Sequence, residues 1–125
     1  MTRIVEIPQV KWRSFLAMLN RLAGGRAVRV EVAQRAIGVQ EMGDRLPLRE
    51  IELETKGSER GHLTITVGSE RGALTHLIEQ PTHISLGLNE AGEPEWLAVA
   101  ERGEATTILH FERLPALEAE VPLGP

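Results

Sequence analysis

The side chains of this sequence best suited to metal binding or general base catalysis are its four histidines, His62, His76, His83 and His110. Imidazole titrates near neutral pH and is a common zinc ligand. The spacing of the four matches no metal-ligand motif. If each lies on a strand of one sheet, His62 and His83 are two strands apart, roughly 9 to 10 Å, which is too wide for joint zinc ligation. We therefore predict no metal site and no cofactor.

Three carboxylates, Glu50, Glu52 and Glu54, alternate along one predicted strand and so share a face at intervals of about 7 Å. This spacing allows calcium binding, or catalysis in which one carboxyl group acts as general acid and another as general base. A calcium loop also needs clustered oxygen ligands around a glycine turn. A solvated strand face is the simpler interpretation. The sequence contains no phosphate-binding glycine loop, nucleophile elbow or His-Glu-x-x-His motif, and no cysteine. Catalysis has no positive support, and an enzyme with an acidic metal site is a third hypothesis.

The formal net charge of −4 is unevenly distributed, because residues 1–35 carry seven basic and two acidic side chains. Such a split can steer an anionic partner, join two copies of the chain, or be neutralised within one molecule. An RNA-associated small barrel would use the N-terminal arginines, Arg13, Arg21, Arg26, Arg29 and Arg35. Single-stranded RNA binders also need stacking aromatics, and the chain has no Tyr, two Phe and two Trp. Nucleic acid is therefore the second hypothesis for a partner.

One stretch has the periodicity of an amphipathic helix. Its apolar residues recur every three or four positions, which places them on one face: Trp12, Phe15, Leu16, Leu19 and Leu22. Pro8 suits the first helical turn, where its missing N–H is not needed, and Gly24 and Gly25 suit the end of a helix. We predict a helix from Pro8 to Ala23.

After the helix, apolar and polar residues alternate with period two, which is typical of strands with one buried face. The predicted strands are 27–32, 50–54, 63–67, 74–79, 82–88, 96–101 and 106–112. Short turns rich in Gly, Asn and Pro separate most of them and favour antiparallel pairing. The predicted fold is α+β: one N-terminal amphipathic helix on an antiparallel β-meander of about seven short strands, which could curl into a partly open barrel.

The length of 125 residues predicts one domain with one core. We assign residues 1–113 to a single α+β domain and residues 114–125, which carry three prolines, to an extended C-terminal tail. The N-terminus lacks a signal-peptide apolar stretch, and no apolar run approaches the roughly 20 residues of a membrane span. A cytoplasmic protein without a membrane partner is expected.

Four segments together resemble a bacterial family of unknown function. They are Ile7-Pro8-x-x-x-Trp12-x-x-Phe15, Leu46-Pro47-Leu48, Thr75-His76-x-Ile78-x-x-Pro81 and the closing hairpin through Phe111. The resemblance spans nearly the whole chain and implies a bacterial protein. It supplies no activity, substrate or catalytic residue.

The predicted strand count places three connections at one end of the sheet: residues 35–45, 68–72 and 89–94. Loops clustered on a rigid scaffold commonly carry binding sites. The candidate binding residues are Glu41, Asp44, Arg45, Glu70, Arg71 and Asn89. Trp96 is a further candidate as a partly exposed aromatic anchor, with core packing as the alternative. The first hypothesis is a non-enzymatic binding or oligomerisation module, whose partner is a second copy or another protein.

Overall fold

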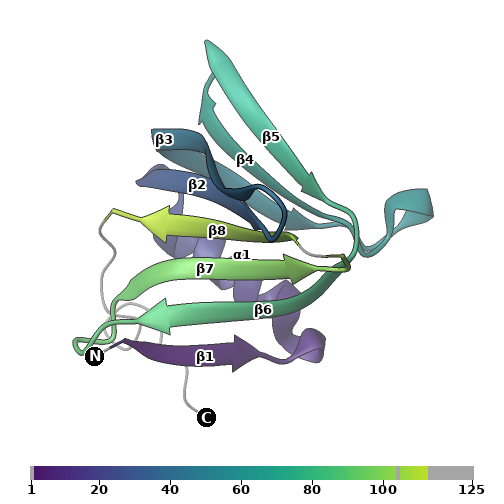
Figure 1. Ribbon diagram of the computed structural model, residues 1–125, viewed down its shortest axis with the longest axis horizontal. Helices are drawn as coiled ribbons and strands as arrows, with labels where there is room; N and C mark the ends of the chain where they lie inside the picture. Colours follow the sequence, from purple (N-terminus) through teal and green to yellow (C-terminus); the bar gives the residue numbers. More distant parts are fainter. Residues whose placement is uncertain (1, 104, 113–125) are drawn as a thin grey trace.

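The computed structural model of the chain describes residues 2–103 and 105–112, which form one N-terminal helix and an eight-stranded antiparallel sheet (Figure 1). The strands are β1 (Arg3–Ile7), β2 (Ala27–Gln34), β3 (Gly38–Leu53), β4 (Leu63–Ser69), β5 (Gly72–Ile78), β6 (Pro81–Leu88), β7 (Pro94–Glu101) and β8 (Ala105–Phe111). The helix is α1 (Trp12–Ala23), and two short 3-10 helices are η1 (Gln9–Lys11) and η2 (Gly57–Glu59). The predicted α+β class is confirmed. The predicted tail, residues 114–125, lies outside the described residues.

The predicted helix is confirmed, with its first turn formed as the 3-10 helix η1. Pro8 precedes that turn with φ −59°, and its carbonyl accepts a hydrogen bond of 2.8 Å from the Lys11 N–H. The apolar face of α1 is buried in the core, with Trp12 4% exposed and Leu19 fully buried. The chain then turns at Gly25, whose φ of 82° lies in the left-handed region that favours glycine.

The sheet joins two consecutive meanders. Its strand order is β1-β6-β7-β8-β2-β3-β4-β5, so β8 pairs with β2 although the two are far apart in sequence. The sheet does not close into a barrel, and β1 and β5 are its edges. The count is eight strands instead of about seven because Arg3–Ile7, too short for a clear sequence pattern, pairs with β6.

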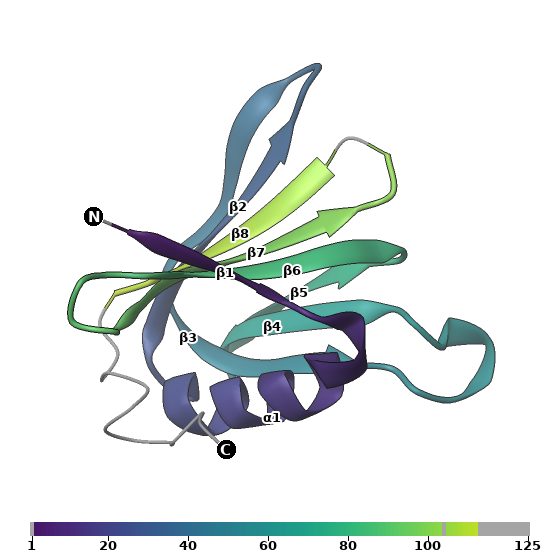
Figure 2. The same ribbon diagram turned by 90° about the horizontal axis from the view of Figure 1, so that it is seen from below.

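The prediction of a long connection over residues 35–45 is wrong. β2 and β3 are joined by a short turn, and Gly38, with φ 78°, begins a strand of 16 residues. β3 bends sharply along its length, pairing first with β2 and then with β4 (Figure 2). Arg45 lies in an irregular stretch of β3 between Gly43 and Leu46, and its φ of 56° is positive, which is uncommon for a residue other than glycine. β2 ends at the 35–37 turn, whereas the 89–94 turn lies near the start of β2. These two connections are therefore at opposite ends of the sheet.

The sheet curls around a single apolar core, and α1 lies on the inner side (Figure 2). Alternate residues of β2, β7 and β8 point into this core, whereas the residues between them form what we call the outer face. The curl brings β5 across from β8, since His76 Nε2 and Thr107 Oγ1 share a hydrogen bond of 2.9 Å. Among the described residues, no helix is long and apolar enough to cross a membrane.

Candidate functional site

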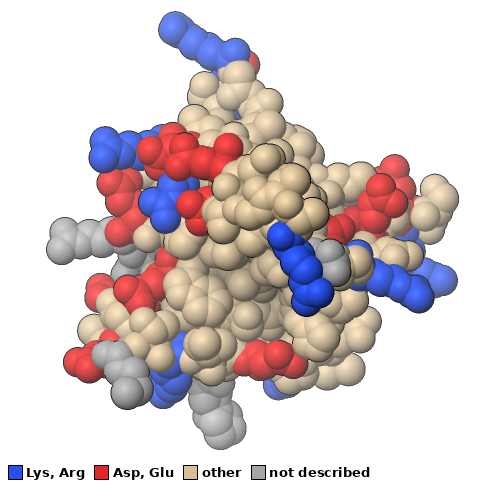
Figure 3. Space-filling view, in the orientation of Figure 1, with Lys and Arg blue, Asp and Glu red and all other residues tan. Residues whose placement is uncertain are grey.

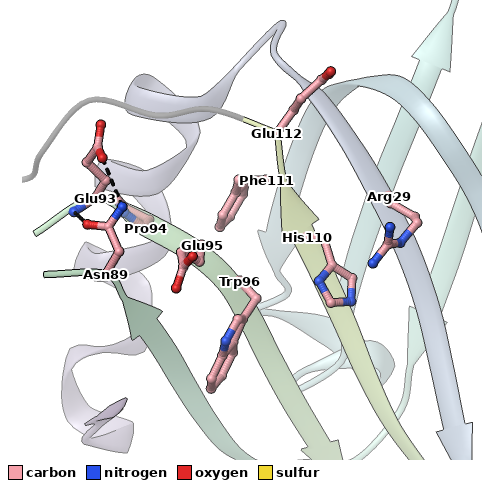
Figure 4. A pocket seen from close by; sticks show the side chains of 9 residues that line it. All are labelled: Arg29, Asn89, Glu93, Pro94, Glu95, Trp96, His110, Phe111 and Glu112. Atoms are coloured by element: carbon pink, nitrogen blue, oxygen red, sulfur yellow. Dashed lines mark hydrogen bonds between the residues drawn. The ribbon is translucent and has the colours of Figure 1, made fainter. Parts of the chain in front are cut away.

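A row of polar and aromatic side chains crosses the outer face where β7, β8 and β2 lie side by side. In the sheet register, Trp96 on β7 faces His110 on β8, and His110 faces Arg29 on β2. The three side chains lie next to one another in Figure 4. Arg29 and His110 each lie between two buried residues, and Trp96 precedes the buried Leu97, so the pleat directs all three outward. All three are partly exposed.

Trp96 is held in place by the strand beside it. Gly87 on β6 is its partner in the register, and a Cβ atom added at Gly87 would overlap the indole ring. The ring therefore packs directly over the Gly87 backbone, which it buries. Glycine within a strand commonly marks such a close approach. The indole is thus fixed on one side and contributes its remaining surface to a groove.

Glu31, two residues further along β2 than Arg29, connects two members of the row. His110 Nε2 donates a hydrogen bond of 2.7 Å to Glu31 Oε1, and Arg29 Nε lies 3.4 Å from Glu31 Oε2. The Glu31 side chain is 21% exposed, so this network is partly shielded from water. Glu31 therefore offsets the charge of Arg29 and orients the His110 ring.

The row forms the floor of a groove of about 560 Å³. Its walls are the turn and strand start 93–95, with Asn89, and the end of β8 at Phe111 and Glu112. A second hollow of about 260 Å³ shares Arg29 and His110 with the first and extends to Asp44 and Arg45 on the bend of β3. Because the two hollows share lining residues, we treat them together and call them the Trp96 groove.

Acidic side chains outnumber basic ones around the Trp96 groove. Glu93, Glu95 and Glu112 line the larger hollow, where Arg29 is the basic residue and is already paired with Glu31. Acidic side chains, with some Lys or Arg among them, lie at the same end of the sheet in the space-filling view, on the left of Figure 3. The groove therefore combines an aromatic surface with an excess of carboxylates over basic side chains.

Hydrogen bonds of the Asn89 side chain stabilise the turn before β7. Asn89 Oδ1 accepts hydrogen bonds of 2.9 Å from the N–H groups of Ala91 and Glu93, and Asn89 Nδ2 donates one of 2.9 Å to Glu93 Oε1. An asparagine that bonds to its own turn in this way is a common turn former. Glu95 Oε1 accepts a hydrogen bond of 3.0 Å from Thr2 Oγ1. Two carboxylates of the groove are thus positioned by neighbours.

The predicted binding residues fall into two groups. The Trp96 groove brings together four of them: Asp44, Arg45, Asn89 and Trp96. The remaining three lie elsewhere. Glu41 is exposed on β3 opposite Glu31, and Glu70 and Arg71 form the turn between β4 and β5.

The other histidines lie apart from the groove. His76 points inward to Thr107, and burial lowers its pKa. His83 Nδ1 is 3.1 Å from Thr82 Oγ1 on the exposed part of β6, and His62 precedes β4. Within residues 2–103 and 105–112, no three His, Asp or Glu side chains are grouped as a metal ion would require.

Comparison with known proteins gives a family but no characterised relative. The family model described as "Family of unknown function (DUF5335)" matches residues 3–120, which is nearly the whole chain. The chain belongs to the DUF5335 family. Comparisons with curated proteins and with solved structures gave no match. The function of this DUF5335 chain must therefore be inferred from its own geometry.

The predicted binding residues did not include His110 and Arg29, the two side chains that lie in a row with Trp96 in this DUF5335 chain. His110 faces Trp96 across the β7–β8 hairpin, but Arg29 joins the row only because β8 pairs with β2, a contact between distant segments that no local pattern reveals. One local signal was available, since Gly87 stands at an outward position of β6 between Leu86 and Leu88. A glycine there indicates that a bulky neighbour approaches the backbone.

Proposed function

We propose that this chain is a non-enzymatic, cytoplasmic binding module of bacteria, and that its Trp96 groove holds a positively charged segment of a protein partner. Trp96 carries the proposal. Its indole is fixed on Gly87, partly exposed, and lines the same hollow as the carboxylates of Glu93, Glu95 and Glu112. Aromatic faces attract Arg and Lys side chains, and Trp is the strongest of these faces. A partner's cation can contact the ring while the nearby carboxylates offset its charge.

The groove favours a peptide segment over a small molecule or a nucleic acid. It is open and lined by mixed polar and apolar groups, as protein-binding surfaces commonly are, and Trp is enriched at their energetic centres. Glu93, Glu95 and Glu112 disfavour the phosphates of RNA, which basic grooves attract. A basic segment in extended or turn conformation fits both the charge and the shape.

Selection of peptides from a displayed random library tests this function. The whole chain is immobilised, and the same selection is run in parallel on Trp96→Ala and on Ile37→Ala, a control change at an exposed residue of the turn between β2 and β3. We expect Arg-containing and Lys-containing peptides to be enriched on the native chain and on Ile37→Ala. Their affinity for Trp96→Ala should be about tenfold lower.

Two outcomes would contradict the proposed function. One is enrichment of the same peptides on Trp96→Ala as on the native chain. The other is enrichment of acidic peptides, because these would be repelled by the carboxylates of the groove.

A further inference from the structure

The edge strand β5 lacks the features that usually protect an exposed strand edge. It is last in the strand order, and among the described residues only β4 pairs with it. Natural proteins protect such edges with charged residues, proline or bulges. Gly72–Ile78 contains no charged residue and no proline, and its pairing with β4 is regular. The other edge, β1, carries Arg3 and Glu6 and ends before Pro8.

The turn before β5 indicates which main-chain groups point to the free edge. Directly opposed residues of antiparallel strands alternately exchange two hydrogen bonds and none. The two-residue turn Glu70–Arg71 closes on the pair Ser69 and Gly72, which makes this pair a hydrogen-bonded one. By alternation, Ala73, Thr75 and Leu77 direct their N–H and C=O groups away from β4. Their side chains are exposed on the outer face, Leu77 by 46%.

We propose that a second copy of this chain binds this edge, with the two β5 strands paired antiparallel about a two-fold axis through Thr75. The free N–H and C=O groups of one copy then meet those of the other, since Thr75 faces Thr75 and Ala73 faces Leu77. The outer faces of both copies stay on the same side, so exposed side chains meet exposed ones. Two-fold pairing of one patch with itself is the commonest arrangement in homodimers.

Charge complementarity supports this register. One position beyond each end of the strand, Arg71 of one copy faces Glu79 of the other, and the symmetry repeats the contact. Both residues are exposed in the single chain. Moving the axis to Leu74 places Arg71 opposite Leu77, and moving it to His76 places Glu79 opposite Ala73. Only the axis at Thr75 pairs the full strand and both charges.

A nearby carboxylate adds to the attraction for a cation at this end of β5. Burial and then the charge of Glu79 raise the pKa of Glu101, which indicates two carboxylates close together. Arg71 of the second copy would bring a positive charge to this pair. Because the contact buries one strand edge from each copy, we expect a dimer that depends on protein concentration. The Trp96 groove is lined by other strands, so its occupancy and dimer formation are separable.

Sedimentation velocity at increasing concentration and low salt tests the dimer and its register. We expect the whole chain to change from monomer to dimer. Arg71→Glu and Glu79→Arg should each weaken the dimer about tenfold, because each places like charges opposite one another. The double variant should restore it, since the exchanged charges again face each other. Glu70→Arg, with the same charge change as Glu79→Arg but facing Gln80, is the matched control.

Cysteine cross-linking gives a second, independent measurement, because the chain contains no cysteine. Hydrogen-bonded residues across antiparallel strands have Cα atoms about 5.5 Å apart, which suits a disulfide. Thr75→Cys should therefore form a covalent dimer on mild oxidation, whereas Thr66→Cys, one strand further from the axis, should not. A chain that stays monomeric, a dimer indifferent to both charge reversals, or equal cross-linking of the two cysteine variants would overturn the proposal.

Discussion

His76 is the side chain whose protonation the fold constrains most clearly. It is half-buried on β5 and faces Thr107, a polar residue that is fully buried on β8. Burial lowers the pKa of His76 because the charged imidazolium loses hydration. The neutral ring therefore fits the folded chain, and the hydrogen bond to Thr107 joins two strands across the core.

The folded chain should lose stability as pH falls because of His76. Its pKa in the folded chain is below the ordinary value of 6.5, so just below that value the unfolded chain binds more protons. The contribution of His76 is complete above pH 6.5 and is lost as the pH falls through its lowered pKa. Urea unfolding at several pH values should show a smaller decrease for His76→Gln than for the native chain. His83→Gln, at an exposed position, is the control, and an unchanged decrease in His76→Gln would contradict the assignment.

Gly87 should control the position of Trp96. A methyl group at Gly87 would overlap the indole ring, so Gly87→Ala must displace Trp96. We expect Gly87→Ala to alter tryptophan fluorescence and to weaken binding of basic peptides as much as Trp96→Ala does. Gly72→Ala is the control, because Gly72 has no left-handed φ and a Cβ atom there meets no neighbour. Unchanged peptide affinity in Gly87→Ala would show that the ring position is unimportant.

At the scale of secondary-structure elements, Asn20 fastens α1 to the second half of β3. Its Nδ2 donates a hydrogen bond of 2.8 Å to the Ile51 carbonyl, and its Oδ1 accepts one of 2.8 Å from the Ile51 N–H. Ile51 pairs with β4 on the other side, so the amide acts as a short substitute for a neighbouring strand. β2 pairs only with the first part of β3, and the helix takes the place of a neighbouring strand beside the second part.

Removing this connection should destabilise the fold. Asn20→Ala loses both hydrogen bonds and leaves the Ile51 groups without these partners, at a cost of about 2 kcal/mol in the free energy of unfolding. Ser14→Ala, on the exposed face of the same helix, is the matched control. Urea unfolding measures both. A cost for Asn20→Ala no larger than that for Ser14→Ala would show that the connection does not stabilise the fold.

The helix and most of the strands were predictable because a local pattern of apolar and polar residues is enough to identify them. Trp12, Leu16 and Leu19 predicted the helix, and alternation predicted most strands, because both patterns record which side of an element is buried. The strand β1 and the bend of β3 were not predictable in this way. β1 exists because it pairs with β6. β3 changes its partner from β2 to β4 after an irregular stretch between Gly43 and Leu46, where Arg45 has a positive φ that no residue preference indicates.

At the scale of the whole molecule, strand order limited what the sequence could predict about the site. Asp44 and Asn89 were proposed together because a connection was predicted at 35–45, where the structure has β3, and Trp96 was proposed separately as an aromatic anchor. They share the Trp96 groove because β3 passes the start of β2, and β8 lies between β2 and β7. Arg29 joins the groove through the pairing of β2 with β8, and His110 through the pairing of β8 with β7.

The molecule offers two separate surfaces for partners. The Trp96 groove lies where β7, β8 and β2 are adjacent, and the free edge lies on β5 at the end of the strand order. A dimer through β5 leaves both grooves open, so each dimer would present two binding sites. Two linked sites increase the apparent affinity for a partner that carries two basic segments.

The most direct test of the proposed function follows the indole N–H signals of the two tryptophans by NMR during titration with N-acetyl-arginine methylamide. Trp12, buried and donating its Nε1–H to the Ile7 carbonyl at 2.9 Å, serves as the internal control. We predict that the Trp96 signal moves in a saturable manner that salt weakens, while the Trp12 signal stays, and that the glutamate analogue moves neither. A Trp96 signal that does not respond to the arginine probe, or responds equally to the glutamate probe, would contradict the proposed function.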